Sequence, residues 1–161
     1  MKLGDYKKKR NFAATSEPAK GRRSASPGGL AYVIQKHAAS RLHYDLRLEA
    51  KGVLLSWAVP KEPPLEPDVR RLAVRVEDHP LGYEKFEGVI PEGQYGAGRV
   101  EIWDSGTYRP VEAAEGKLVI EISGRKLRGQ YALIRLKPKP GEKDKNWLFF
   151  KLEGHKQHGA A

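Results

Sequence analysis

The chain has 161 residues, which is enough for one domain with a well-formed hydrophobic core. Its 30 Lys and Arg against 20 Asp and Glu give a formal net charge of +10, which favours polyanionic partners, nucleic acid before acidic membrane surfaces. It has no cysteine and no apolar run near the about 20 residues of a membrane span, which excludes disulfides, thiolate metal ligands, cysteine nucleophiles and a membrane-spanning helix.

Residues 1–28 are predicted to form a flexible basic arm. They hold eight Lys and Arg but only two acidic residues, so six of the ten net charges lie there, and the segment ends in a run rich in Ser, Pro and Gly. Such a composition buries little surface. We expect the arm either to be simply solvated or to gather polyanions. Because the N-terminus lacks the apolar segment of a signal peptide, we expect a soluble cytoplasmic protein.

A β-strand is predicted over residues 41–49, where apolar and polar residues alternate with a period of two. The apolar positions are Leu42, Tyr44, Leu46 and Leu48, and the polar positions are His43, Asp45, Arg47 and Glu49. A further imidazole, His37, precedes this strand across a short Ala-Ala-Ser connection. The spacing His-x5-His-x-Asp can bring three donors together and leave coordination positions open, as in a catalytic metal site. The alternative is a strand whose polar face simply lies in water.

A second strand with the same alternation is predicted over residues 71–79. Its apolar positions Leu72, Val74 and Val76 are expected to face the core, and the other face bears Arg71, Arg75, Glu77 and His79. Tyr83 follows after a Pro-Leu-Gly turn. We expect both polar faces to meet at one mouth of the fold.

The glycine-rich segment 88–98 matches a phosphate-cradling loop only weakly. It lacks the third glycine of the dinucleotide fingerprint, and residues 99–103 alternate as a strand where that fingerprint needs a helix. We therefore expect its glycines to serve a tight turn or bulge.

The remaining elements are also short strands separated by turn signals. They are expected at residues 31–35, 53–59, 107–109, 116–122, 130–136 and 146–152, with a proline-rich loop at 61–68, a turn at 104–106 and a basic hairpin at 124–129. About eight strands and no convincing helix predict an all-β fold, a compact antiparallel β-barrel over residues 29–153, followed by a polar tail at 154–161.

Four segments together resemble the 3′-phosphoesterase domain of bacterial ATP-dependent DNA ligases of nonhomologous end joining, the ligase D type, which also occurs in stand-alone versions. They are Gln35 to Glu49, Ser56 to Lys61, Arg71 to His79 and Pro91 to Gly96, and the resemblance extends from the region of Arg10 to Phe149. It implies a β-barrel enzyme that uses a divalent metal, manganese first, with zinc or cobalt as alternatives. Such an enzyme removes a 3′-terminal ribonucleoside from a primer strand and then hydrolyses the 3′-phosphate to a 3′-hydroxyl.

The same resemblance implies roles for individual residues. The metal ligands would be His37, His43 and Asp45; Arg47 and His79 would contact the scissile phosphate, with Tyr83 and Glu77 completing the catalytic set; Gln35, Ser56, Lys61, Arg71, Arg10 and Glu17 would bind substrate. Asn11 stands where the family has Asp. A planar guanidinium such as Arg47 can hold a phosphate bidentately, and an imidazole such as His79 suits a general acid near neutral pH.

The resemblance also implies primer-template 3′ ends as substrates, ligase and polymerase modules and Ku as partners, and a location at the nucleoid. A monomer is the default expectation for the oligomeric state. The alternative is a non-catalytic β-barrel that binds nucleic acid as a repair scaffold. That alternative predicts exposed aromatic residues interleaved with Lys and Arg. The tryptophans Trp57, Trp103 and Trp147 instead lie mostly in apolar runs, which favours the enzyme.

Overall fold

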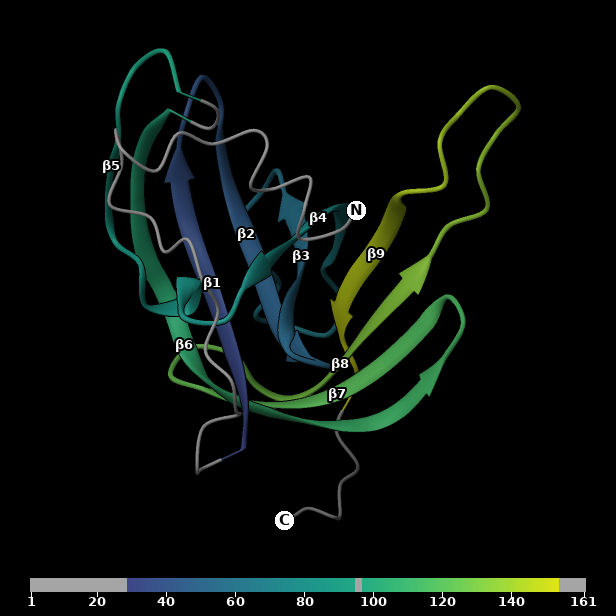
Figure 1. The fold of residues 1–161 in the computed structure, drawn as a ribbon. Coiled ribbons are helices and arrows are strands. Elements are labelled where there is room, and N and C mark those ends of the chain that lie inside the picture. The colour runs from purple at the N-terminus through teal and green to yellow at the C-terminus, as the bar shows by residue number, and fades with distance from the viewer. Residues whose placement is uncertain (1–28, 95–96, 154–161) are drawn as a thin grey trace.

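The computed structural model describes residues 29–94 and 97–153. Within these ranges the chain forms nine strands and one short 3-10 turn, η1 (Figure 1). The elements are β1 (Leu30–Ala38), β2 (Leu42–Ala50), β3 (Val53–Val59), β4 (Arg70–Pro80), η1 (Tyr83–Lys85), β5 (Gly88–Ile90), β6 (Gly98–Ala114), β7 (Lys117–Gly124), β8 (Arg128–Arg135) and β9 (Asn146–Lys151). No helix among the described residues is long and apolar enough to cross a bilayer. The predictions for the basic arm and the polar tail concern residues outside the described ranges.

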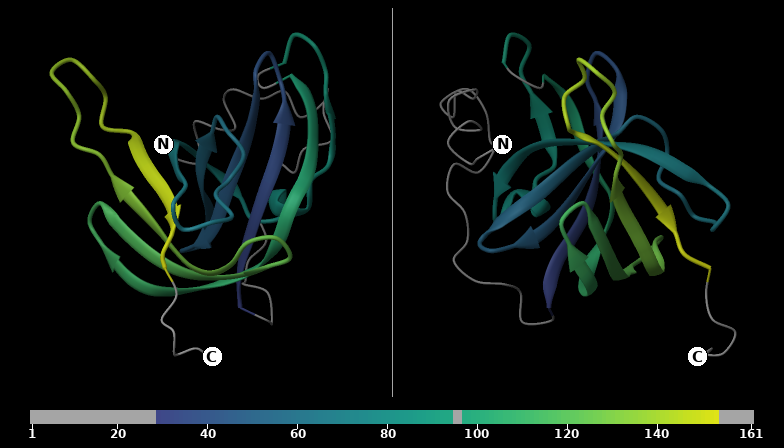
Figure 2. Two further views of the ribbon diagram at one scale, coloured as in Figure 1. Left: turned by 180° about the vertical axis from the view of Figure 1, so that it is seen from behind. Right: turned by 90° about the vertical axis from the view of Figure 1, so that its right-hand side faces the viewer.

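Eight of the strands close into an antiparallel barrel. Their order is β1-β2-β3-β4-β9-β8-β7-β6, and β6 pairs back with β1, while β5 adds to the edge of β6. Strand β6 is 17 residues long, and its first part pairs with β1 and its second part with β7, so it wraps around one side of the barrel (Figures 1 and 2). The predicted all-β barrel of about eight strands is confirmed.

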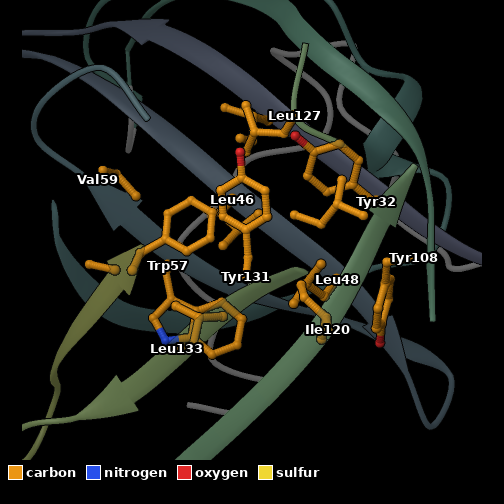
Figure 3. Packing of buried hydrophobic residues seen from close by; sticks show 14 of the residues in the cluster. Tyr32, Leu46, Leu48, Trp57, Val59, Tyr108, Ile120, Leu127, Tyr131 and Leu133 are labelled. Carbon is orange, nitrogen blue, oxygen red and sulfur yellow. The ribbon is translucent and has the colours of Figure 1, made fainter. Parts of the chain in front are cut away.

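Apolar side chains from all eight barrel strands fill the interior (Figure 3). The even-numbered residues Tyr44, Leu46 and Leu48 of β2 belong to this cluster, which confirms the predicted core face for these three residues, whereas Leu42 at the start of the strand is 47% exposed. Fully burying one such aliphatic side chain contributes about 1.5–3 kcal/mol, so this cluster is the main source of stability.

The opposite face of β2 is buried as well, because a second layer of side chains covers it from outside the barrel. The segment that joins β4 to β5 and contains η1 lies against the wall near β1 (Figure 1), and it contributes Leu81, Tyr83 and Phe86 to a separate apolar cluster with Val100 of β6. The polar face of β2 therefore does not lie in water. We expected this face to line a mouth of the barrel, but it lies on the outer wall, under the segment that contains η1.

The predicted core face of β4 is wrong. Leu72 is 41% exposed, whereas Ala73 is fully buried in the interior and Arg75 lies over the ring of Trp57, 5.1 Å from its centroid. The pairing of β3 with β4 contains a β-bulge between Leu54 and Ser56, which shifts the register. Because a bulge inserts an extra residue, it turns His79 onto the same outer wall as the polar face of β2.

The predicted turn at residues 104–106 is also wrong, because these residues continue β6. The pairing of β6 with β1 skips Trp103, and the next residue, Asp104, is buried. Its carboxylate accepts hydrogen bonds from the Tyr32 hydroxyl and from the backbone N–H groups of residues 125–127. Asp104 thereby fixes the turn between β7 and β8, which is the predicted basic hairpin.

The glycine-rich segment forms a hairpin, since β5 pairs with the start of β6. Gly93 has a φ of 88°, which favours glycine in the turn. A Cβ on Gly98 would lie 2.2 Å from the Ala38 carbonyl oxygen, so only glycine lets β6 approach β1 there. The turn role that we predicted for this segment is consistent with this geometry.

Candidate active site

Three potential metal ligands meet at one end of the β1–β2 hairpin. Strand β1 runs to Ala38, so His37 lies within a strand and not in a connection, directly opposite His43 of β2. Asp45 follows on the same face, with its Oδ2 3.5 Å from His37 Nδ1 and its Oδ1 3.2 Å from His43 Nε2. One ligand atom from each of the three residues lies within 4.8 Å of the others. Two imidazoles and a carboxylate in this arrangement can hold a divalent metal ion with coordination positions left open.

Hydrogen bonds around the three residues favour this use. His43 Nδ1 lies 3.3 Å from the Arg41 carbonyl oxygen, so with a proton on Nδ1 the other ring nitrogen, Nε2, can exchange the proton that it donates to Asp45 for a metal ion. Burial by itself would lower the pKa of His43, but the hydrogen bond and charge of Asp45 outweigh it and raise that pKa. Burial would raise the pKa of Asp45, but hydrogen bonds from His37 and His43 and the charge of Arg47 hold it well below its usual range. The carboxylate is therefore ionised and ready to accept a cation.

The guanidinium of Arg47, two residues beyond Asp45 on β2, is buried beside these ligands. Its Nε donates to Gln35 Oε1 at 2.7 Å and its Nη1 donates to Ser56 Oγ at 2.8 Å. Its Nη2 lies 3.5 Å from Asp45 Oδ2, toward the metal ligands. Because Nε and Nη1 are already engaged, Arg47 faces the metal ligands with Nη2.

His79, Glu77 and Tyr83 close the other side of the same pocket. His79 Nδ1 lies 3.2 Å from Arg47 Nη1 and 3.1 Å from the Glu77 carbonyl oxygen, and the His79 ring meets that of Tyr83 edge to face at 4.7 Å. The pocket has a volume of about 240 Å³. It is lined by His37, Ala39, His43, Asp45, Arg47, Ala58, Val76, Glu77, His79 and Tyr83.

Not every predicted site residue reaches this pocket. Gln35 and Ser56, predicted to bind substrate, are fully buried and contact Arg47 instead. Lys61 is exposed in the loop after β3, and Arg71 donates from Nε to the Glu62 carbonyl oxygen at 2.6 Å, so neither lines the pocket.

Arg10 and Glu17, also predicted to bind substrate, fall outside the described ranges. The structure also brings residues without a polar side chain to the pocket. Sequence reasoning missed Ala39, Ala58 and Val76, which line the pocket as small or apolar side chains. Ala58 lies directly opposite Asp45 in the β2–β3 pairing, so only the strand register could have identified it.

Comparisons with known proteins identify the family to which the chain belongs. The model of the DNA ligase D 3′-phosphoesterase domain matches residues 35–135, which include every described site residue from Gln35 to Tyr83. The multifunctional non-homologous end joining protein LigD of Pseudomonas aeruginosa is 54% identical over 140 residues, which are 83% of this chain and 16% of that protein.

A second relative covers more of the chain. The multifunctional non-homologous end joining DNA repair protein LigD of Mycobacterium tuberculosis is 43% identical over 159 residues, 96% of this chain and 20% of that protein. The chain thus spans about a fifth or less of the length of these relatives. The family match and these identities show that the chain belongs to the family of the DNA ligase D 3′-phosphoesterase domain.

Proposed function

We propose that this protein is a metal-dependent hydrolase that heals DNA 3′ ends for end joining. It would remove a 3′-terminal ribonucleoside by phosphodiester cleavage and then hydrolyse the remaining 3′-phosphate to a 3′-hydroxyl. The observation that carries the proposal is one pocket that joins three metal donors to a buried guanidinium and an imidazole. The family membership supports the same reaction class.

His37, His43 and Asp45 would hold the metal, which we propose to be manganese, with zinc and cobalt as alternatives for such a donor set. When bound there, a divalent ion supplies Lewis-acid polarisation of a phosphoryl oxygen. The Arg41 carbonyl keeps the His43 ring in the orientation that serves this role.

The chain's own groups then bind and orient the phosphate. Arg47 would donate from Nη2 to a non-bridging oxygen and neutralise its charge, which matters most in a site shielded from water. His79 keeps its Nδ1 between Glu77 and Arg47, so it would meet the leaving oxygen through Nε2 and donate a proton to it. That oxygen would be the 5′-oxygen of the ribonucleoside in the diester step and the 3′-oxygen of the primer in the monoester step, with water as the attacking group in both. Tyr83 packs against the His79 ring and limits its rotation.

Other assignments extend the proposal beyond the pocket. Glu77 would complete the catalytic set, and Lys61, Arg71, Arg10 and Glu17 would contact the substrate outside the scissile phosphate. The substrates would be primer-template ends that carry a terminal ribonucleotide or a 3′-phosphate. Partners would be ligase and polymerase modules and Ku, with the protein itself a monomer at the nucleoid.

The test uses metal-stripped protein and two labelled primer-templates, one ending in a single ribonucleotide and one in a 3′-phosphate. Manganese is added or omitted, and His43→Ala is compared with Lys117→Ala, a control on the exposed surface. We expect both ends to become 3′-hydroxyls only with manganese, and only in the wild type and the control. Binding of the duplex without change to either end would favour the non-catalytic scaffold.

A further inference from the structure

We propose that Gln35 and Ser56 are positioning residues that hold the Arg47 guanidinium in place before substrate binds. On this inference neither side chain touches the phosphate, although both were expected to bind substrate. The inference rests on the proposed function only in that it takes Arg47 as the phosphate-binding group. Its evidence lies in the hydrogen bonds around Arg47.

The side-chain amide of Gln35 makes three hydrogen bonds within the protein. Nε2 donates to the Tyr83 carbonyl oxygen at 2.7 Å and to the Phe86 carbonyl oxygen at 3.1 Å, and Oε1 accepts from Arg47 Nε at 2.7 Å. An amide has two N–H donors, and both are used here. The reverse orientation would place oxygen against two carbonyl oxygens and nitrogen against a donor, so the surroundings fix the amide one way. Gln35 therefore ties Arg47 to the segment that carries Tyr83.

Ser56 holds the guanidinium at a second point. Its hydroxyl accepts from Arg47 Nη1 at 2.8 Å and donates to the Leu54 carbonyl oxygen at 3.1 Å, so its proton is directed away from Arg47. Ser56 lies directly opposite Arg47 in the β2–β3 pairing, and it is fully buried. Because this buried hydroxyl already donates one hydrogen bond and accepts another within the protein, it does not contact the substrate.

Two fixed points determine where the third nitrogen faces. With Nε and Nη1 held, the planar guanidinium can only direct Nη2 toward Asp45 and the metal ligands. The ring of Tyr83, 4.9 Å from the guanidinium carbon, covers one of its faces. Arg has several rotatable bonds, and restricting them beforehand avoids an ordering penalty in the reaction.

A double-mutant cycle tests the inference with hydrolysis of the 3′-phosphate end as the readout. We expect Gln35→Ala to lower kcat/KM about 10–100-fold and Ser56→Ala several-fold, with manganese affinity unchanged. In an Arg47→Ala background the same two changes should lower kcat/KM only slightly further, because the guanidinium that they position is gone. A loss as large in that background as in the wild type would overturn the inference.

Ser56→Thr keeps the hydroxyl and should retain more activity than Ser56→Ala. The melting temperature of each variant shows whether it folds. If Gln35→Ala does not fold, the cycle is measured with Ser56→Ala alone.

A second cycle measures the binding of inorganic phosphate to the manganese-loaded protein by calorimetry, which requires no turnover. If the wild type hydrolyses neither end but the phosphate cycle shows the coupling, the proposed function fails and the positioning role stands. If the phosphate cycle shows no coupling, the positioning role fails.

Discussion

Two buried aspartates, Asp45 and Asp104, serve different purposes in this protein. Both are almost inaccessible, at 6% and 2% exposure. Asp104 accepts four hydrogen bonds of 2.8–2.9 Å, three of them from backbone N–H groups. Asp45 has ionisable side chains around it, His37, His43 and Arg47, at 3.2–3.5 Å, and it lines a pocket.

The difference shows that burial of a carboxylate does not by itself identify a functional site. Buried backbone N–H groups need an acceptor in every state of the protein, so the Asp104 carboxylate is permanently occupied by the turn that it holds. Imidazoles can exchange a proton for a metal ion, so the surroundings of Asp45 can change state without the fold changing. The partners of a buried charge therefore distinguish a structural carboxylate from a reactive one.

The largest effect is expected from Asp45→Asn. It removes the negative ligand and should lower turnover of the 3′-phosphate end by about 100-fold or more, as well as manganese affinity. The melting temperature of the metal-free protein should also fall, because the lowered pKa of Asp45 means that its ionised form stabilises the fold, but it should fall less than for a change at Asp104, because no backbone group loses a partner. A large drop in melting temperature with turnover intact would contradict the assignment of Asp45 as the reactive aspartate and Asp104 as the structural one.

The same substitution at the other site, Asp104→Asn, should act on stability. The new amide places N–H groups against backbone N–H groups, and losing these charged hydrogen bonds costs about 3 kcal/mol. For a chain of this size the melting temperature should fall by about 6–12 °C. Turnover per folded molecule, measured well below that temperature, should match the wild type.

A smaller loss of stability is expected from Gly124→Ala. The added Cβ would lie 2.5 Å from Asp104 Oδ2 and 2.8 Å from Tyr32 Cε2, so the carboxylate and its partner must move apart. Such overpacking costs about 1–3 kcal/mol of unfolding free energy, which urea titration measures. The exposed neighbour Ser123→Ala is the control and should leave stability unchanged.

The smallest effect concerns alkaline pH. Burial, and then the charge of Asp104, raise the pKa of Tyr32 well above its ordinary value of 10.0. The folded state thus keeps a proton that the unfolded chain loses, so this stability is complete below about pH 10 and declines as pH rises further. Tyr32→Phe should make the unfolding free energy fall less steeply above pH 10. Burial also raises the pKa of Tyr108 to about 12, so some decline should remain. Identical slopes for the variant and the wild type would contradict this account.

The sequence predicted the strands better than it predicted their faces. Alternation over residues 41–49 identified β2 and the face that packs in the core, since the two faces of a strand alternate by a local rule, although the polar face is buried too. The same rule failed for β4, because Leu72, Val74 and Val76 alternate equally well while Ala73 packs in the interior. The turn predicted from the Asp-Ser-Gly run at residues 104–106 failed for another reason, because these residues lie inside strand β6.

The sequence by itself determined the barrel class and the three candidate metal ligands. Those ligands lie on two strands joined by a short connection, so their meeting depends on local hairpin pairing alone. We expected His79 to join them, but only the tertiary structure decided that it does so on the outer wall, through the bulge between β3 and β4, and that Gln35 and Ser56 hold Arg47. These contacts depend on register and on a covering segment up to 51 residues away in the chain, which no local periodicity encodes.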